Sequence, residues 1–432
     1  MSRGPSTQCL PPAPPLAAAW PRLLPGAAAD DSGPSDLREH LARHGARPSC
    51  AGDWQRRQRL IDEVERAGLT GRGGAAFPAA VKLRTAASSP RAPVVIANGV
   101  EGEPASAKDK VLLSCAPHLV IDGAVSAAEL VGASEAVIVA HPAACEAVRR
   151  AAGERAAAGC DPVPVRVLEA AGGFTAGEAS AVVHWTKRGT PVPTGRPPRL
   201  GGPGRRPALV HNVETLAHFA LIIRHGACWF RTAGTPAEPG TMLVTLLGVV
   251  RHPGVYEVEP GTRVSDVLGL AGGTPEEPGA LLIGGYFGTW AAAADALPLP
   301  FSAAGLSPLG ARPGAGVVAV LPSAACGLAE TARLARYLAR SSAGQCGPCV
   351  LGLDAIAREL EQAAVGGSCD LPRLRRWLRD VTGRGACRHP DGTALMVASA
   401  LRVFRAEFGL HLRGRCSATA GAGILPVADR SP

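Results

Sequence analysis

A cysteine pair near the carboxyl end has the spacing of metal or cluster ligands. Cys346 and Cys349 form a Cys-x-x-Cys motif in "SSAGQCGPCVLGL" (341–353), where glycines bound a turn that leads into a helical pattern. Thiolates at this spacing ligate iron–sulfur clusters and zinc. A cysteine three residues earlier would extend the motif, but that position holds Ala343. The pair predicts a metal centre whose other ligands lie elsewhere in the chain, and the alternative is ordinary reduced thiols.

A glycine-rich turn is a second candidate site. The stretch "GLTGRGGAAFP" (68–78) places Gly71, Gly73 and Gly74 between two expected helices. Glycines let the backbone approach a ligand closely and turn its N–H groups towards an anion. The stretch predicts a phosphate-binding loop, and the alternative is a tight turn that needs unusual dihedral angles.

A polar stretch follows the first expected strand. "ANGVEGEPASAKDK" (97–110) places Asn98, Glu101 and Glu103 beyond the carboxyl end of that strand. Ligands of open α/β sheets bind at this edge. Two carboxylates and an amide can hydrogen-bond a flavin ring, a ribose or a nicotinamide, whereas the alternative is a solvated surface loop.

Alternating strands and helices must position these groups. Runs rich in β-branched residues at 93–98, 135–140 and 162–170 predict strands, and helical patterns separate them at 119–133 and 143–159. This alternation predicts βαβ units and a parallel sheet.

Further elements surround and follow this sheet. A charged amphipathic helix is expected at 54–67, and a turn with a helix at 206–226. A small β-grasp-like sheet is predicted from strand patterns at 241–250, 254–260, 281–288 and 316–322, crossed by a helix at 263–272. A C-terminal bundle of four helices is predicted from apolar positions at helical spacing, including Leu334, Leu353, Leu374 and Leu401.

Composition and charge exclude several classes of protein. The 432 residues carry a formal net charge of +9, but no Lys/Arg run with interleaved aromatic residues, which argues against nucleic-acid binding. The densest basic stretch, at 195–207, is interpreted as a solvated loop rather than a docking site for an acidic partner. No stretch approaches about eighteen uninterrupted apolar residues, so the chain is not expected to span a membrane. Residues 1–50 lack periodicity and a compact secretory signal, so we expect a mostly disordered tail and a cytoplasmic protein with reduced thiols.

Five motifs occur in one order: "GLTGRGGAAFP", "ANGVEGEP…KDK", "GGFTAGEASA", "HNVETL" and "GQCGPC". Together they resemble the NADH-oxidising flavoprotein component of respiratory complex I and its relatives in NAD-dependent hydrogenases and formate dehydrogenases. The resemblance covers roughly residues 55–410. It implies an α/β plus α chain with a Rossmann-like FMN-binding domain, a ubiquitin-like β-grasp domain of the SLBB type, and a C-terminal four-helix bundle with one [4Fe–4S] cluster. The implied domains are a tail at 1–50, the flavin and NADH domain at 51–236, the SLBB domain at 237–325, the helical Fe–S-binding domain at 326–412, and a tail at 413–432.

The resemblance also implies roles for individual residues. Arg72 would add a fixed positive charge to the phosphate loop, and Phe77 matches an aromatic residue that can stack on the nicotinamide or flavin ring. Glu103 would share the NADH pocket with Phe77. The positions implied for cofactor binding are Gly71, Arg72, Gly73, Gly74, Lys82, Asn98, Glu101, Glu103, Gly177, Glu178, Asn212 and Thr215.

Several positions depart from the family pattern around the flavin and nicotinamide pockets. Val100 replaces an aspartate, Phe174 a tyrosine, Ala179 a glutamate and His211 an asparagine, and Arg199 stands where an aromatic residue is expected. The departures remove polar contacts to the flavin ring but leave the phosphate loop in place. They predict an altered flavin potential and different access to the ring.

The family's cluster ligands are a Cys-x-x-Cys-x-x-Cys run and a fourth cysteine about forty residues later. Cys346 and Cys349 match the second and third ligands, and Cys387 matches the fourth, whereas Ala343 holds the first position. Three completions remain open. Cys416 or His389 supplies the missing ligand, the fourth iron stays open or takes a non-protein ligand, or the site holds a [3Fe–4S] cluster or Zn²⁺.

These features predict an electron-transfer flavoprotein that works as one subunit of a larger assembly. It would pass electrons from a donor such as NAD(P)H through FMN to the cluster, and then to a ferredoxin-like or thioredoxin-fold Fe–S subunit or a membrane-associated redox partner. Its expected place is the cytoplasm, or the inner face of the cell membrane through its partners. The alternative function is a non-catalytic scaffold or assembly module that keeps the fold and a metal site but has lost flavin and NADH binding.

Overall fold

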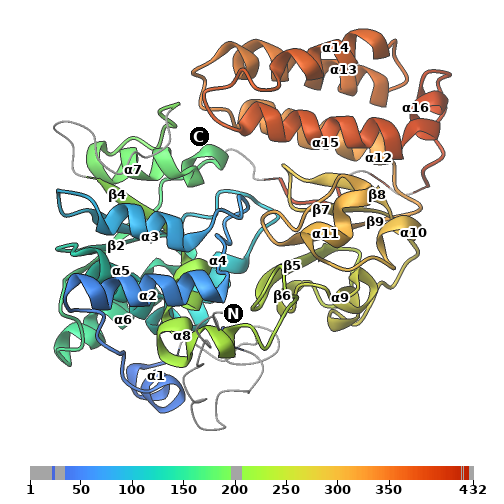
Figure 1. Ribbon diagram of the computed structural model, residues 1–432. Helices are drawn as coiled ribbons and strands as arrows, with labels where there is room; N and C mark the ends of the chain where they lie inside the picture. The colour runs from blue at the N-terminus through green and yellow to red at the C-terminus, as the bar shows by residue number, and fades with distance from the viewer. Residues whose placement is uncertain (1–21, 25–34, 196–206, 420, 422, 428–432) are drawn as a thin grey trace, which may run out of the picture.

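The structure is a computed structural model that describes residues 22–24, 35–195, 207–419, 421 and 423–427. The blue-to-green part of the chain forms a parallel sheet with its helices (Figure 1). The yellow part forms a second sheet, and the orange-to-red part forms a helical bundle above the second sheet. Arg199 and nearly all of the basic stretch at 195–207 lie outside the described residues.

The first sheet has four strands in the order β3-β2-β1-β4, and every pair is parallel. Its strands are β1 (Val94–Gly99), β2 (Ala136–Ala140), β3 (Val165–Glu169) and β4 (Ala208–Asn212). The chain steps outward from β1 to β3 and then returns to the other side of β1 as β4. Ligands of open α/β sheets bind where the strand order reverses in this way.

The sheet is confirmed where the sequence predicted it, with one strand added. The segment before α8 was expected to be a turn, but Ala208–Asn212 pairs with β1 over its whole length. A short strand that runs directly into a helix offers no Gly or Pro boundary, so its pattern merges with that of the helix.

Eight helices accompany this sheet. They are α1 (Leu37–His44), α2 (Trp54–Ala67), α3 (Ala79–Ala87), α4 (Lys108–Cys115), α5 (Pro117–Val131), α6 (Pro142–Ala157), α7 (Ala179–Arg188) and α8 (Val213–Phe230), with a 3₁₀ turn η2 (Phe174–Gly177) before α7. Helices α5 and α8 approach so closely that a Cβ on Gly123 would lie 1.9 Å from the Leu216 carbonyl oxygen. Only glycine fits at that crossing.

Helix α1 differs from the expected disordered tail at 1–50. Asp36 and Glu39 form a reciprocal capping box at its start. His40 then reaches Asp122 of α5 at 2.7 Å, and Arg155 donates to the same carboxylate at 2.8 Å. A buried carboxylate shared by His40 and two arginines anchors this segment, and such long-range contacts leave no local pattern in the tail itself.

The second sheet has five strands in the order β6-β5-β9-β7-β8. The strands are β5 (Met242–Gly248), β6 (Gly254–Val258), β7 (Pro278–Ile283), β8 (Thr289–Ala292) and β9 (Val317–Pro322), and the short helices are α9 (Val264–Leu270), α10 (Ala293–Ala296), α11 (Ala303–Leu306) and the 3₁₀ turn η3 (Ser307–Leu309). The predicted antiparallel hairpin of β5 and β6 and the helix that follows it are confirmed. β8 was not predicted.

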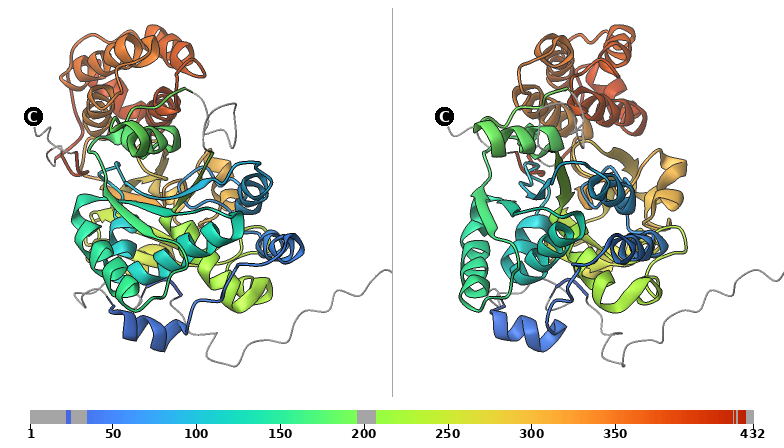
Figure 2. Two further views of the ribbon diagram at one scale, coloured as in Figure 1. Left: turned by 90° about the vertical axis from the view of Figure 1, so that its left-hand side faces the viewer. Right: turned by 60° about the vertical axis from the view of Figure 1, so that its left-hand side comes forward.

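The C-terminal bundle begins directly after β9. It contains α12 (Gly327–Arg340), a π-helical turn η4 (Pro348–Leu353), α13 (Asp354–Ala364), α14 (Leu371–Val381), α15 (His389–Val403) and α16 (Arg405–His411). The expected fourth helix is divided into α15 and α16. The bundle shares one apolar core with β7 and β9 of the second sheet, and it lies at one end of the molecule in all views (Figure 2).

No single helix in the described part of the chain has the length and apolar character of a membrane span. One helix pair, Lys108–Cys115 with Pro117–Val131, meets the length and composition test together, but it is bent by 96°.

Candidate functional site

The carboxyl ends of β1 and β4 meet where the strand order reverses. Asn98 of β1 and Asn212 of β4 are register partners at this point. The Asn98 side chain donates to the Gly177 carbonyl at 2.9 Å, and the Asn212 Oδ1 atom accepts from the Glu214 N–H at 3.0 Å. A Cβ on Gly73 would lie 3.3 Å from the Asn212 Cβ. The glycine turn and both asparagines, separate in the sequence, therefore meet at the edge where ligands of such sheets bind.

The glycine turn has a row of free backbone N–H groups. A hydrogen bond of 2.8 Å from the Gly71 N–H to the Phe77 carbonyl closes the turn. Among the residues that the structure describes, the N–H groups of residues 73–76 donate to no protein acceptor. Gly74 and Ala76 have φ angles of +95° and +49°, and strained backbone of this kind is typical of ligand-binding loops. Unpaired N–H groups in a turn bind phosphate well, so the turn fits the phosphate of FMN.

Arg72 and Thr215 fix the base of the turn. The Arg72 N–H donates to Thr215 Oγ1 at 2.9 Å, and its guanidinium donates to the Pro239 carbonyl at 3.0 Å. Burial lowers the pKa of the guanidinium, and the charges of Glu214 and Glu238 oppose this effect. Arg72 thus connects the turn to the segment that enters the second sheet, a contact that the sequence did not indicate.

Lys82 and Phe77 flank the turn. The Lys82 Nζ atom donates to the Val210 carbonyl at 3.2 Å and lies 5.8 Å from the centroid of the Phe77 ring. Burial lowers the pKa of Lys82. One hydrogen bond leaves two of the three ammonium donors for a ligand. The Phe77 side chain is 46% exposed and is available for stacking.

A buried charge network lies beneath Asn212, and the sequence did not reveal it. Lys108 Nζ donates to Asp109 at 2.7 Å and to Glu214 at 2.9 Å, and Asn212 Nδ2 donates to the other Asp109 oxygen at 2.6 Å. Burial alone would lower the pKa of Lys108, but these carboxylates outweigh that effect and raise the pKa above its usual value. Glu214 also accepts from the Leu243 N–H of β5 at 2.9 Å. The network orients Asn212 and joins the two sheets. In the sequence, the charged residues of the "KDK" and "VET" stretches were the one sign of this network.

Two of the predicted cofactor-binding glutamates cap helices. The Glu101 carboxylate accepts two backbone N–H bonds in the first turn of α4, at 3.0 and 2.8 Å, and one from Ser106 at 2.5 Å. Glu178 accepts two N–H bonds at the start of α7, at 2.9 and 3.1 Å. These carboxylates fix the loops on which they stand, and a direct contact with FMN stays a prediction.

Glu103 closes the site against the second sheet. Its Oε1 atom accepts from the Tyr286 N–H at 2.6 Å, and a Cβ on Gly285 would lie 2.3 Å from the same atom. Burial raises the pKa of Glu103 to about 8, against the opposing effect of the Tyr286 hydrogen bond. The carboxyl group is therefore mostly protonated at pH 7.

We expect Glu103→Gln to make the protein less sensitive to alkaline pH. The native state keeps a proton on Glu103 that the unfolded chain loses near pH 4.5, so this group's contribution to stability falls as pH rises from 4.5 to about 8. At about 1.4 kcal/mol per pKa unit, the stability difference between variant and wild type should grow by roughly 2–3 kcal/mol from pH 6 to pH 8.5. Urea unfolding at both pH values measures it. The exposed Glu276→Gln is the control, and parallel pH profiles for Glu103→Gln and wild type would contradict the assignment.

Three of the residues that depart from the family pattern, Val100, Phe174 and His211, are buried. Val100 packs in the core beside β1, and the Phe174 ring lies 4.8 Å from that of Phe287 and 5.5 Å from that of His389. His211 is buried near Lys82, and burial lowers the pKa of His211 to about 3. Its Nε2 atom has no hydrogen-bond partner in the described part of the chain. Apolar side chains at Val100 and Phe174 and an uncharged imidazole at His211 therefore stand where the family has polar groups.

The three predicted thiolate ligands are neighbours in the bundle. Cys346 lies two residues before η4, Cys349 lies in the first turn of η4, and Cys387 lies in the turn before α15. Burial raises the pKa of Cys349 to about 12, and the charges of Cys346 and Cys387 act in the same direction. Burial also raises the pKa of Cys387. Such thiols ionise together only around a cationic centre, which fits a cluster.

His389, one predicted fourth ligand, is engaged elsewhere. Its Nε2 atom lies 2.8 Å from the Leu338 carbonyl, and its ring packs against Phe174 and Phe287. Its backbone N–H bonds the Cys387 thiol. His389 therefore supports Cys387 through its backbone.

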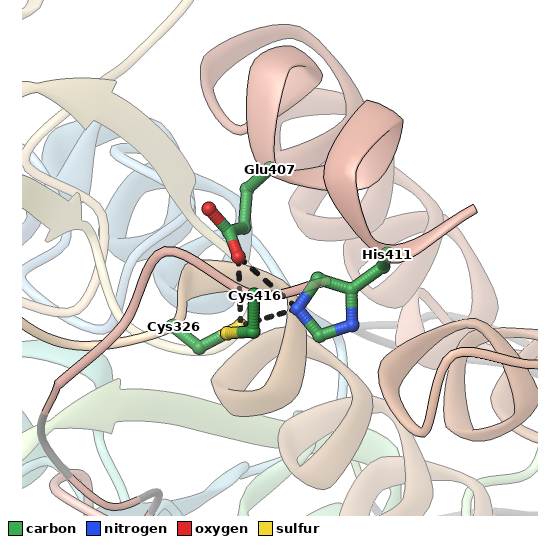
Figure 3. A group of neighbouring side chains, drawn as sticks. All are labelled: Cys326, Glu407, His411 and Cys416. Atoms are coloured by element: carbon green, nitrogen blue, oxygen red, sulfur yellow. Dashed lines mark hydrogen bonds and ion pairs between the residues drawn. The ribbon is translucent and has the colours of Figure 1, made fainter. Parts of the chain in front are cut away.

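Cys416, the other predicted fourth ligand, belongs to a different group. It stands with Cys326, Glu407 and His411, whose ligand atoms all lie within 4.8 Å of one another (Figure 3). No other group of three or more His, Cys, Asp or Glu side chains in the described ranges is as close. The expectation that Cys416 folds back to the cysteine pair is wrong, because the chain after α16 runs past the start of α12.

Three family models match successive parts of the chain. "Nuo51 FMN-binding domain" matches residues 64–220, "SLBB domain" residues 243–285, and "NADH-ubiquinone oxidoreductase-F iron-sulfur binding region" residues 329–411. The matches follow the three structural parts in order.

Named relatives and a solved structure agree with these matches. The F 2 subunit of the NADH-quinone oxidoreductase of Rhizobium meliloti is 30% identical over 379 residues, 82% of this chain and 89% of the relative. The F subunit of the Streptomyces coelicolor enzyme of the same name is 30% identical over 441 residues, 97% and 95% of the two chains. A crystal structure of an NAD⁺-reducing [NiFe]-hydrogenase in the air-oxidized state superposes with a TM-score of 0.76 and 31% identity over 82% of this chain. The superposition covers 63% of the hydrogenase chain, less than two thirds of its length.

Proposed function

The chain belongs to the F-subunit family of NADH-quinone oxidoreductases, and we propose that it works as the family's electron-entry flavoprotein, which takes electrons from NADH through FMN to an iron–sulfur cluster. The observation that carries the proposal is the glycine turn. Its unpaired N–H groups stand over the point where the strand order reverses, beside a lysine with free donors and an exposed aromatic ring.

The chain's own residues have distinct tasks in this proposal. The N–H groups of residues 73–76 and the Lys82 ammonium bind the FMN phosphate. The network of Lys108, Asp109 and Asn212 keeps the turn in place, because Asn212 is the residue against which Gly73 rests. Bound FMN supplies hydride acceptance and the release of single electrons.

Glu103 and Phe77 form the donor side of the pocket. Phe77 offers a ring face to the nicotinamide or flavin. Because burial raises the pKa of Glu103 to about 8, its carboxyl group at neutral pH brings little negative charge towards the pyrophosphate of a dinucleotide. This arrangement favours an anionic donor such as NADH.

Cys346, Cys349 and Cys387 bind the cluster in this proposal. Phe174 belongs to the loop that follows β3, and its ring contacts His389, two residues beyond Cys387. Close aromatic packing excludes water between the flavin loop and the cluster turn. Because His389 Nε2 and Cys416 are engaged elsewhere, these three cysteines are the protein ligands that we propose for the cluster.

The partners follow from the family. Relatives are named as subunits of NADH-quinone oxidoreductase, so this chain works with further redox subunits of an assembly. We infer that its immediate partner is an Fe–S subunit of the ferredoxin-like or thioredoxin-fold class. Attachment to the inner face of the cell membrane would then come through such partners.

The test is reduction of the protein's own flavin. Chain purified without oxygen should contain FMN, iron and sulfide, and NADH should bleach the flavin absorbance within the mixing time of a stopped-flow experiment. Bleaching by dithionite but by neither NADH nor NADPH would remove the dehydrogenase assignment. A colourless protein that stays colourless after incubation with FMN would remove the flavoprotein assignment.

We expect Lys82→Met to weaken FMN binding about 10- to 100-fold, because one charge-assisted hydrogen bond to phosphate is worth about 1.5–3 kcal/mol. Methionine keeps most of the side-chain volume and removes the charge. Flavin fluorescence titration of the FMN-stripped chain measures the change. Arg84→Met removes a positive charge from the same helix but from a residue that is bound to Asp62 and Glu65, and it should leave FMN affinity unchanged. An equal loss of FMN affinity in both variants would mean that the positive charges of this helix act only through long-range electrostatics and not through a direct bond from Lys82.

A further inference from the structure

Four potential metal ligands converge at the base of the bundle, outside the predicted cluster site. Cys326 lies at the N-cap of α12, and Glu407 and His411 lie four residues apart on one face of α16. Cys416 approaches from the segment that follows α16, and all four side chains point to a common centre (Figure 3). The first and last of these residues are 90 positions apart, so only the fold brings them together.

The distances between ligand atoms match those around one tetrahedral ion. The Cys326 Sγ atom lies 3.3 Å from His411 Nε2 and 4.0 Å from Glu407 Oε1, and the latter two atoms are 3.1 Å apart. Zinc–ligand bonds of about 2.0–2.3 Å at tetrahedral angles separate the ligand atoms by about 3.3–3.8 Å. These three side chains therefore need only small movements to surround an ion, and the Cys416 Sγ atom lies within 4.8 Å of each of their ligand atoms.

Backbone and hydroxyl groups already orient three of the four ligands. The Ala329 N–H donates to Cys326 Sγ at 3.3 Å, and the Ala418 N–H donates to Cys416 Sγ at 3.4 Å. Ser417 donates its N–H to Glu407 Oε1 at 3.0 Å and its hydroxyl to the other carboxylate oxygen. Supporting hydrogen bonds of this kind are typical of built metal sites.

Burial is graded across the group. Cys326 is 7% exposed and His411 5% exposed, whereas Cys416 is open to solvent. The buried ligands provide a low-dielectric site, and the exposed Cys416 provides a path by which an ion can enter.

We propose that Cys326, Glu407, His411 and Cys416 bind one Zn²⁺ ion in a structural site that is separate from the iron–sulfur cluster. Two thiolates and an imidazole favour zinc over calcium or magnesium, which take oxygen ligands. Four protein ligands leave no open position, so the site is structural rather than catalytic. The short ligand–ligand distances suit a single ion and leave no room for a cubane.

The ion would fasten the C-terminal segment to the bundle. Beyond Cys416, the Thr419 N–H donates to Ala324 at 3.0 Å, and the Leu425 N–H donates to Glu330 of α12 at 2.8 Å. Leu425 itself is fully buried in the core shared by the bundle and the second sheet. Zinc at the start of this segment would hold it across the junction of those two parts.

The decisive measurement is metal content of the full-length chain and its variants, by inductively coupled plasma mass spectrometry after anaerobic purification. Wild type should hold about one zinc per chain besides iron, and Cys416→Ala and His411→Ala should each lose nearly all zinc while they keep iron. Cys387→Ser should show the reverse, with iron lost and zinc kept. The exposed Cys228→Ser should change neither metal.

A second readout guards against a variant that simply misfolds. Wild-type chain reconstituted with Co²⁺ should show the visible d–d bands of tetrahedral thiolate coordination, and zinc should slow tryptic cleavage at Arg413 and Arg415 at least several-fold relative to the chelator-treated chain. Three results would overturn the proposal: wild type without stoichiometric zinc, zinc content unchanged in Cys416→Ala, or a Cys326–Cys416 disulfide in the native protein by non-reducing mass spectrometry. Loss of iron rather than zinc in Cys416→Ala would return Cys416 to the cluster.

Discussion

Gly73→Val is expected to weaken FMN binding by about 100-fold, equivalent to roughly 3 kcal/mol, while the fold and the cluster persist. A Cβ at position 73 would already lie 3.3 Å from the Asn212 Cβ, closer than ordinary van der Waals contact, and valine adds two methyl groups to that Cβ. The turn must move away from Asn212 or Asn212 must leave its bonds to Asp109 and Glu214. Either movement displaces the N–H groups that face the phosphate.

The control for Gly73→Val is a glycine at which a valine side chain meets no neighbouring atom. Gly269 on α9 has an ordinary φ angle and nothing within 4 Å of its Cβ position, so Gly269→Val is the matched control. FMN occupancy, iron content and circular dichroism are measured on all three proteins. Full flavin occupancy in Gly73→Val would make the phosphate assignment wrong, and global unfolding would make these glycines a structural turn.

Elements with strong local patterns could be predicted from the sequence. Strands β1 to β3 follow from runs of β-branched residues, and α2 from its amphipathic pattern and from Gly68, which ends it in a left-handed conformation. Asp370 caps α14, with its side chain accepting from the Arg373 N–H three residues later at 2.8 Å. In each case the physical cause lies within a few residues of its effect.

Elements fixed by distant contacts could not be predicted. α1 depends on the buried Asp122, and β4 on pairing with β1 across more than a hundred residues. The same limit applies to the site. Motif order singled out the glycine turn and the three cysteines as groups, but the network of Lys108 exists only in three dimensions.

The thiol groups show the limit most clearly. The sequence suggested Cys416 or His389 as the missing ligand of the cysteine pair, yet the neighbours of Cys416 are Cys326, Glu407 and His411. Which turn of a bundle a tail reaches depends on helix lengths and crossing angles, and no local spacing encodes these. Because Ala343 stands where the family has its first cluster cysteine, we propose that a cysteine at this position would supply a fourth ligand.

Ala343→Cys is expected to complete the cluster's ligand set and to slow its decay in air about tenfold or more. Ala343 stands three residues before Cys346, where the family pattern has its first cysteine. It lies half-buried just beyond the end of α12, in the turn that leads to η4. A fourth thiolate would occupy the iron that is otherwise open to solvent and oxidants, so both iron loss and oxidative conversion to a three-iron cluster should slow.

The control for this prediction is another added thiol in the same turn. Gln345 is exposed and directly precedes Cys346, so Gln345→Cys adds a cysteine out of register with the motif. Cluster absorbance in air, iron per chain and low-temperature EPR of the reduced protein compare the two variants with wild type. Only Ala343→Cys should approach four irons per chain and hold them. If both variants decay as wild type does, a group other than a cysteine already fills the fourth position; if both are equally protected, the gain comes from an extra thiol and not from the geometry of the motif.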